Sequence, residues 1–155
     1  MEGENSQLHK NKVHKVLFHS YFTYLILFLV GVCLDLAFNL KVFDRSAAKT
    51  GFALLILGTF FIFWAQKTSR NLQKDGIVNK EFFSHGPYAF TRTPTNFGLF
   101  FLMLGYGMIA NTFFIIIFSF VAFLLAKFIF LKREEHILAE KYGAPYLEYK
   151  KSVKL

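Results

Sequence analysis

The chain has 155 residues, of which 54% are hydrophobic and 22 are Phe, and its formal net charge is +8. Water-soluble domains contain fewer apolar residues and far less Phe, so this composition argues against a soluble globular fold. The basic residues flank long apolar runs, which argues against nucleic-acid binding and favours a membrane protein. The single cysteine, Cys33, gives no disulfide framework, and we expect no bound metal.

Two uncharged apolar runs follow a short polar and basic tail. The first covers residues 17–34 and ends at Asp35, and the second covers residues 50–66 with Trp64 near its end. Each run is long enough to cross a bilayer, and Trp suits the membrane–water boundary. We therefore expect the first two membrane helices at about 17–38 and 48–67.

The third apolar run is free of formal charge over residues 95–126. This length is too great for one ordinary membrane span and tight for two. Gly105, Gly107 and Asn111 lie near its middle, where a tight turn fits. The run predicts a helical hairpin with a short first arm, formed by helices at about 95–110 and 112–131.

The placement of Lys and Arg predicts the topology. Only Lys41, Arg45 and Lys49 lie on the connection between the first two apolar runs. All other basic residues lie in the N-terminal tail, in the 67–94 connection or after Ala126. Because basic residues are retained on the cytoplasmic side, we expect a multi-pass integral membrane protein with both termini in the cytoplasm.

The C-terminal segment has a helical pattern that is broken once. Gly143 fits the position just after a helix, and Pro145 fits the first turn of the next. This predicts cytoplasmic helices at about 132–153. The expected fold class is an all-α integral membrane helical bundle with about four transmembrane helices, in a single domain over residues 1–155.

A candidate site lies where polar segments meet the cytoplasmic face. Glu134 and Glu135 are adjacent at a membrane exit, where carboxylates are costly and oppose the basic residues around them. A cationic or polyhydroxylated ligand would explain them, and Arg92 could bind a ligand carboxylate. Taken singly, the glutamates also fit solvated helix charges, and Arg92 also fits a membrane-interface anchor.

The loop before the third apolar run carries a motif. Gly86-Pro87-Tyr88, Arg92-Thr93-Pro94 and Gly98 resemble the G-P-Y-x-x-x-R-H-P-x-x-x-G signature of the isoprenylcysteine carboxyl methyltransferase and phospholipid methyltransferase superfamily. The apolar hairpin and the glutamate pair follow in the family's order. The segment from Tyr142 to Tyr149 then resembles the family's F-G-x-x-Y-x-x-Y tail.

The resemblance implies S-adenosylmethionine-dependent methyl transfer to a lipid-like or small hydrophobic acceptor (a carboxylate, an amine or a thiol) that enters from the bilayer. It implies catalytic roles for Arg92 and Glu135, membrane lipids as partners, and neither a metal nor nucleic acid. The cofactor-binding residues that it implies are Gly86, Pro87, Tyr88, Arg92, Thr93, Pro94, Asn96, Gly98, Glu134 and Glu135.

One position departs from the family pattern. Thr93 stands where the family has His, and a hydroxyl can donate one hydrogen bond but cannot carry charge. The alternative interpretation is therefore a catalytically degenerate membrane protein of the same fold. A small transporter or channel subunit would need ionisable or broken-helix features at mid-membrane, and the expected hairpin turn explains the residues near Asn111 better.

Overall fold

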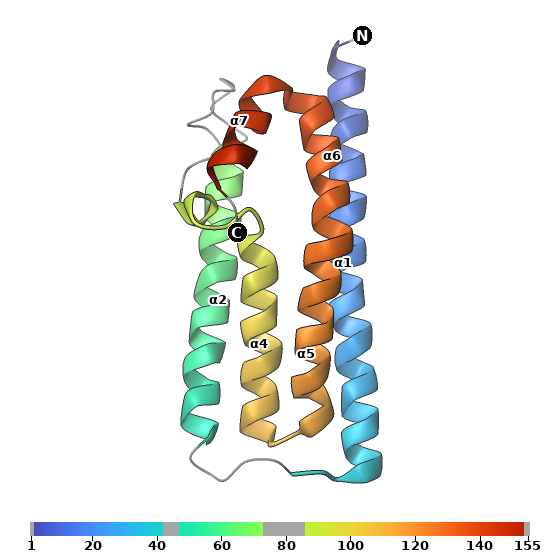
Figure 1. Ribbon diagram of the computed structural model, residues 1–155, viewed down its shortest axis with the longest axis vertical. Helices are drawn as coiled ribbons and strands as arrows, with labels where there is room; N and C mark the ends of the chain where they lie inside the picture. Colours follow the sequence, from blue (N-terminus) through green and yellow to red (C-terminus); the bar gives the residue numbers. More distant parts are fainter. Residues whose placement is uncertain (1, 42–46, 73–85, 154–155) are drawn as a thin grey trace.

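The structure is a computed structural model that describes residues 2–41, 47–72 and 86–153 and, within these ranges, all side chains except those of 2–14, 17, 69–72 and 141–142. The described chain is helical and has no strand (Figure 1). Its helices are α1 (Glu2–Phe38), α2 (Ala47–Leu72), α4 (Pro94–Ala110), α5 (Phe113–Leu125), α6 (Leu131–Tyr142) and α7 (Ala144–Ser152). A 3-10 turn covers Gly86–Ala89, and a π-helical segment at Ala126–Phe130 joins α5 to α6.

Three helical stretches are long and apolar enough to cross a membrane, at Phe18–Phe38, Ala47–Thr68 and Phe113–Glu140. The fourth apolar helix, α4, has 17 residues and spans about 25 Å, slightly less than a bilayer core. The expected all-α membrane helical bundle is thus confirmed, including its hairpin with a short first arm.

The first helix is longer than the apolar run predicts. It begins at Glu2, whereas the sequence pattern indicates a start near residue 17. No proline interrupts the polar tail, and its Glu, Gln and Lys residues favour helix, so an established helix continues through them. Arg45 and residues 73–85 of the 67–94 connection lie outside the described residues.

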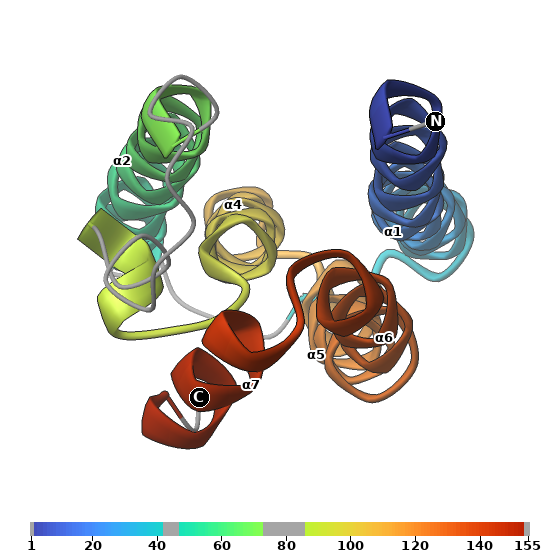
Figure 2. The same cartoon turned by 90° about the horizontal axis from the view of Figure 1, so that it is seen from above.

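The long helices stand in the order α2, α4, α5, α1 when viewed along the bundle (Figure 2). Four glycines allow close contact between α2 and α4. A methyl group added at Gly51 would come within 2.7 Å of the carbonyl oxygen of Gly105, and one at Gly58 would come equally close to that of Gly98. In lipid, such close backbone approach is a main source of helix–helix attraction.

The hairpin turns at Asn111. This residue adopts the left-handed conformation (φ 54°), which Asn tolerates better than most residues, and its backbone N–H donates to the carbonyl of Gly107. The N–H of Thr112 donates to the same carbonyl at 2.9 Å. The prediction of a turn near Asn111 is confirmed.

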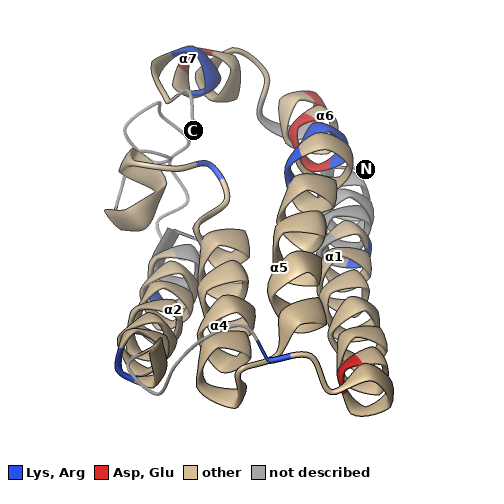
Figure 3. Cartoon of the chain, turned by 60° about the horizontal axis from the view of Figure 1, so that its bottom comes forward, with Lys and Arg blue, Asp and Glu red and all other residues tan. Residues whose placement is uncertain are grey.

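Asp35 joins the end of α1 to the start of α5. It is 8% exposed, and its two carboxylate oxygens accept hydrogen bonds from the N–H groups of Phe114 and Ile115, each at 3.1 Å. These groups have no partner within their own helix, and a negative charge complements the helix dipole there. Asp35 therefore caps α5 from a different helix, since Thr112 makes no side-chain cap. Figure 3 shows the charged residues gathered at the two ends of the helices.

Candidate functional site

Three segments that are distant in sequence meet at one end of the bundle. They are the loop before α4, the helix α6 and the helix α7, and the start of α1 lies at the same end (Figure 1). The loop begins with the 3-10 turn, in which Pro87 is buried. Gly86 has a φ of +61° and lies so close to Thr68 of α2 that a side chain would collide with it. The turn is therefore fixed to the end of α2, and it positions the residues that follow.

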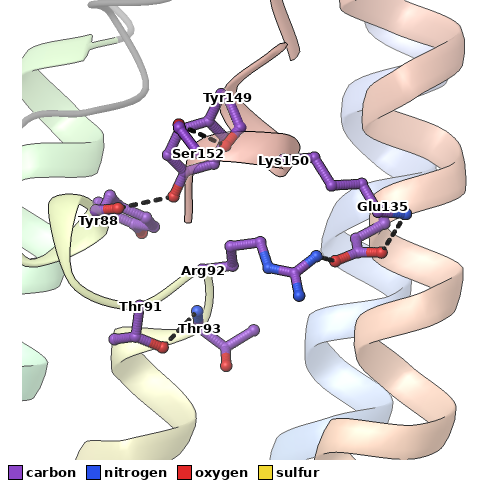
Figure 4. Close-up of polar contacts among 8 residues, drawn as sticks. All are labelled: Tyr88, Thr91, Arg92, Thr93, Glu135, Tyr149, Lys150 and Ser152. Atoms are coloured by element: carbon purple, nitrogen blue, oxygen red, sulfur yellow. Dashed lines mark hydrogen bonds and ion pairs between the residues drawn. The ribbon is translucent and has the colours of Figure 1, made fainter. Parts of the chain in front are cut away.

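Arg92, Glu135 and Lys150 form a charged cluster (Figure 4). Arg92 extends from the loop and forms an ion pair with Oε1 of Glu135 on α6. The Lys150 ammonium of α7 lies 2.6 Å from the other carboxylate oxygen, Oε2. Glu135 is only 6% exposed, so this carboxylate needs its two cationic partners.

The π segment decides which glutamate faces Arg92. Along the continuous helix, the buried positions are Ile115, Ser119, Ala122, Ala126, Leu131 and Glu135. The step from Ala126 to Leu131 is longer than an α-helical turn because the π segment holds an extra residue. In an uninterrupted α-helix, the buried positions after Ala126 would follow at steps of three or four residues, near 130 and 133–134. The π segment therefore turns Glu135, rather than Glu134, toward the cluster.

The helix α7 is fixed against the loop by aromatic residues. The Tyr149 hydroxyl donates to the Tyr88 carbonyl at 2.8 Å, and Tyr146, Tyr149 and Val153 form a buried cluster with Tyr88 beside it. Burial raises the pKa of Tyr149. Burial also raises the pKa of Tyr146, and the charges of Glu135 and Glu134 raise it further. Both phenols therefore stay protonated near neutral pH, and Tyr149 remains a hydrogen-bond donor.

Two residues of the expected cofactor-binding set, Gly98 and Asn96, face neighbouring helices, and a third, Pro94, is buried. Gly98 packs against Gly58 and Ile62 of α2. The buried Asn96 accepts a hydrogen bond from Ser20 of α1 at its side-chain oxygen, and its carbonyl accepts one from Tyr24. Pro94 is buried at the first turn of α4. Helix packing therefore explains Gly98 and Asn96, and the position of Pro94 in the first turn suits the start of a helix.

Thr93 lies beside Arg92 at the start of α4 (Figure 4). Its backbone N–H donates to the hydroxyl of the buried Thr91 at 3.3 Å. Its own hydroxyl does not cap the helix. Thr91 thus stabilises the loop, and Thr93 stands at the position where the motif has His.

Two site residues escaped the sequence analysis. In the sequence, Lys150 is one of several basic residues of the C-terminal segment, and Tyr149 is the last residue of the tail motif. The resemblance implies a cofactor cleft between the loop and the C-terminal helices. The spacing of Tyr146, Tyr149 and Lys150 after Gly143 does not show which of these side chains contact the loop or Glu135. Within the described residues, no group of three or more His, Cys, Asp or Glu is placed to hold a metal ion.

These features define a class of protein: an all-helical membrane protein with a cluster of opposite charges at one end of a helical hairpin, closed by a C-terminal helix. A family model described as phospholipid methyltransferase matches residues 47–145. The chain belongs to this family, which confirms the resemblance drawn from the motif and implies membrane methyltransferase activity in the broad sense. No curated protein and no solved structure matches the chain.

Proposed function

We propose that the chain transfers a methyl group from S-adenosylmethionine to a lipid-like or small hydrophobic acceptor at the cytoplasmic face of a membrane. The observation that carries the proposal is the Arg92–Glu135–Lys150 cluster, which joins the family's loop motif to α6 and α7. Opposite charges held side by side suit a ligand that bears an ammonium group and a carboxylate on one carbon atom.

The residues of the cluster fit the amino-acid end of such a cofactor. Glu135 already accepts two cationic groups, so its carboxylate is suited to a ligand ammonium. The Lys150 side chain is 43% exposed, and a ligand ammonium can replace it at Glu135 without a large desolvation cost. In this proposal Arg92 binds the ligand carboxylate and Tyr88 packs on the adenine ring.

When bound, S-adenosylmethionine supplies an electrophilic methyl group on a sulfonium sulfur. A carboxylate or thiolate acceptor has no proton to lose, so the residues need only align the acceptor and exclude water. An amine acceptor needs a base, and Glu134 is the better candidate. Glu134 has no ion pair with any described side chain, whereas Glu135 is held by two cations.

The proposed topology places the site in the cytoplasm. The start of α1 and the helix α7 lie at the same end of the bundle (Figure 1). Together with the distribution of Lys and Arg, this supports a multi-pass protein with both termini on the cytoplasmic side. The acceptor then enters from the bilayer along the exposed apolar helices, as an isoprenylcysteine carboxyl methyltransferase-like protein would require.

Calorimetry on the purified protein in detergent and in lipid nanodiscs tests the proposal, with S-adenosylmethionine and S-adenosylhomocysteine as ligands. We expect saturable binding of both. Glu135→Gln and Arg92→Ala should each weaken binding roughly 10- to 100-fold, because each removes a charged hydrogen-bond partner of the ligand. Glu148→Gln is the matched control, since Glu148 is exposed on α7 and should leave binding unchanged.

The alternative of a degenerate protein predicts a different result. Absence of binding in both detergent and nanodiscs would contradict the proposal. Thr93→His then gives a second test, because a histidine restores a ring nitrogen and a titratable charge at the motif position. Binding gained by this variant indicates a pocket that lost one ligand contact, and no gain supports the degenerate interpretation.

A further inference from the structure

A groove with a cavity volume of about 280 Å³ separates α1 from the start of α6. It is lined by Lys15, Val16 and His19 of α1 and by Phe130, Arg133 and Ile137 across from them. Its α6 wall is distinct from the methyl-transfer cluster. Arg133 and Glu135 are two positions apart on a helix, which turns their side chains to nearly opposite faces. The groove therefore lies on the side of α6 that faces α1.

Basic side chains converge on this groove, and the described side chains that line it include no acidic residue. Neither Lys15 nor Arg133 forms an ion pair with a side chain that the structure describes. His19 adds a third nitrogen-bearing group. Its Nδ1 lies 2.6 Å from the Lys15 carbonyl, which can only accept, so the proton is on Nδ1 and Nε2 is the ring nitrogen left for a ligand. The groove thus offers two fixed positive charges and one imidazole.

The remaining walls and the surface beyond the groove are apolar. Val16, Phe130 and Ile137 line it, and Phe22 and Ile26 continue the same face of α1 one and two turns further along. Phe22 and Ile26 are 49% and 43% exposed. The groove also lies at the level where the apolar span of α1 begins, at Phe18. A charged ligand with a long apolar part fits this arrangement.

We propose that this groove binds one anionic phospholipid, with its phosphate between Lys15 and Arg133 and its acyl chains along the exposed apolar face of α1. A phosphate diester presents two charged oxygens that Arg and Lys bind well. The described side chains that line the groove are two cations, one imidazole and three apolar groups, with no carboxylate among them, and this favours a lipid of net negative charge over a zwitterionic one. The bound lipid is distinct from the methyl acceptor, because the groove and the Arg92–Glu135 pair occupy different faces of α6.

Native mass spectrometry of the full chain in detergent tests this site. Phosphatidylglycerol and phosphatidylcholine with identical acyl chains are titrated separately, with inorganic phosphate as a competitor. We expect one phosphatidylglycerol to bind in preference to phosphatidylcholine, and inorganic phosphate to displace it poorly. Arg133→Gln and Lys15→Gln should each weaken phosphatidylglycerol binding about tenfold, because each removes one charged contact to the phosphate.

Lys132→Gln is the matched control. Lys132 is the neighbour of Arg133, carries the same charge and is exposed, but it does not line the groove. An equal loss of binding in this variant would overturn the site in favour of general charge attraction. Equal binding of both lipids would overturn the preference for an anionic lipid, and efficient displacement by phosphate would assign the groove to a free anion. S-adenosylmethionine binding should be unchanged in both groove variants, so this test fails or succeeds independently of the methyl-transfer proposal.

Discussion

Glu134 and Glu135 have the same side chain and adjacent positions, yet their surroundings differ. Glu135 is nearly buried and is bound by Arg92 and Lys150, whereas Glu134 has no ion pair among the described side chains. The two partners of Glu135 also differ, because Arg92 is largely buried and Lys150 is 43% exposed. Solvent screens an exposed pair and leaves a buried pair strong, so these contacts should contribute unequally to stability.

Replacing the two cations separately measures this difference. Arg92→Met should lower the free energy of unfolding by about 2–3 kcal/mol, because it leaves a buried carboxylate with one exposed partner. Lys150→Met should lower it by less than about 1 kcal/mol. Unfolding in mixed micelles, followed by circular dichroism, gives both values. Equal losses from the two variants would contradict the stronger structural role of the Arg92 pair.

Asp35 gives a second prediction at the scale of single residues. Asp35→Ala should lower the free energy of unfolding by about 2 kcal/mol, because two N–H groups of the first turn of α5 lose a charged acceptor. Asp35→Asn keeps one acceptor oxygen and should cost about half as much. The same unfolding assay applies, with Glu148→Ala as an exposed control expected to change stability by less than about 0.5 kcal/mol. A loss from Asp35→Ala no larger than that of the control would show that α5 needs no cap from α1.

At the scale of helices, the π segment can be tested by changing the chain length. Deleting Phe128, which is 58% exposed, should convert the segment to α-helix and keep Glu135 facing Arg92. Inserting one Ala after Phe128 should rotate α6 by about 100° and turn Glu135 away. The measured quantity is the coupling energy from a double-mutant cycle of Arg92→Ala and Glu135→Gln in each background.

We expect a coupling of about 1–3 kcal/mol in the original chain and in the deletion variant. The insertion variant should show a coupling close to zero. If the π segment holds one extra residue, deleting one residue leaves an α-helix with Glu135 still facing Arg92. Loss of coupling in the deletion variant would contradict this interpretation of the π segment.

The contact between α2 and α4 gives the next prediction. Gly58→Ala should lower the free energy of unfolding by about 1–3 kcal/mol, because its methyl group would meet backbone atoms of Gly98 and Leu102 that cannot move alone. This loss must exceed the roughly 1 kcal/mol that Ala adds to helix propensity. Thr59→Ala, at the next and exposed position, is the control and should have little effect.

Gly58→Ala should also change the position of Arg92 in the candidate site. Arg92 lies just before α4, so separation of α4 from α2 moves it relative to Glu135 on α6. Gly58→Ala should therefore weaken S-adenosylmethionine binding as well as stability. A stabilised Gly58→Ala variant would show that α2 and α4 are further apart than the glycine contacts indicate.

For the whole molecule, the sequence was sufficient for the fold class and insufficient for the contacts of the site. Run lengths and the Asn111 turn predict the membrane bundle and its hairpin because lipid enforces helices of a certain length. Glu135 rather than Glu134 faces Arg92 because the π segment holds one extra residue in a helical turn. No residue type in the sequence predicts a π segment at this position. The Asp35 cap and the Lys150 contact join segments far apart in sequence, so local patterns cannot predict them.

Cysteine labelling tests the arrangement of the whole chain in a membrane. Cys33→Ser removes the single natural thiol, and single cysteines then replace Lys15, Lys41 or Lys151, which are all exposed. In sealed vesicles, a membrane-impermeant maleimide should label positions 15 and 151 from the same side and position 41 only from the opposite side. This follows because Lys41 comes after the apolar span of α1, at the end of the bundle far from α7. Labelling of all three positions from one side would mean that α1 lies on the membrane surface, and the charged cluster would then need a different route to an acceptor in the bilayer.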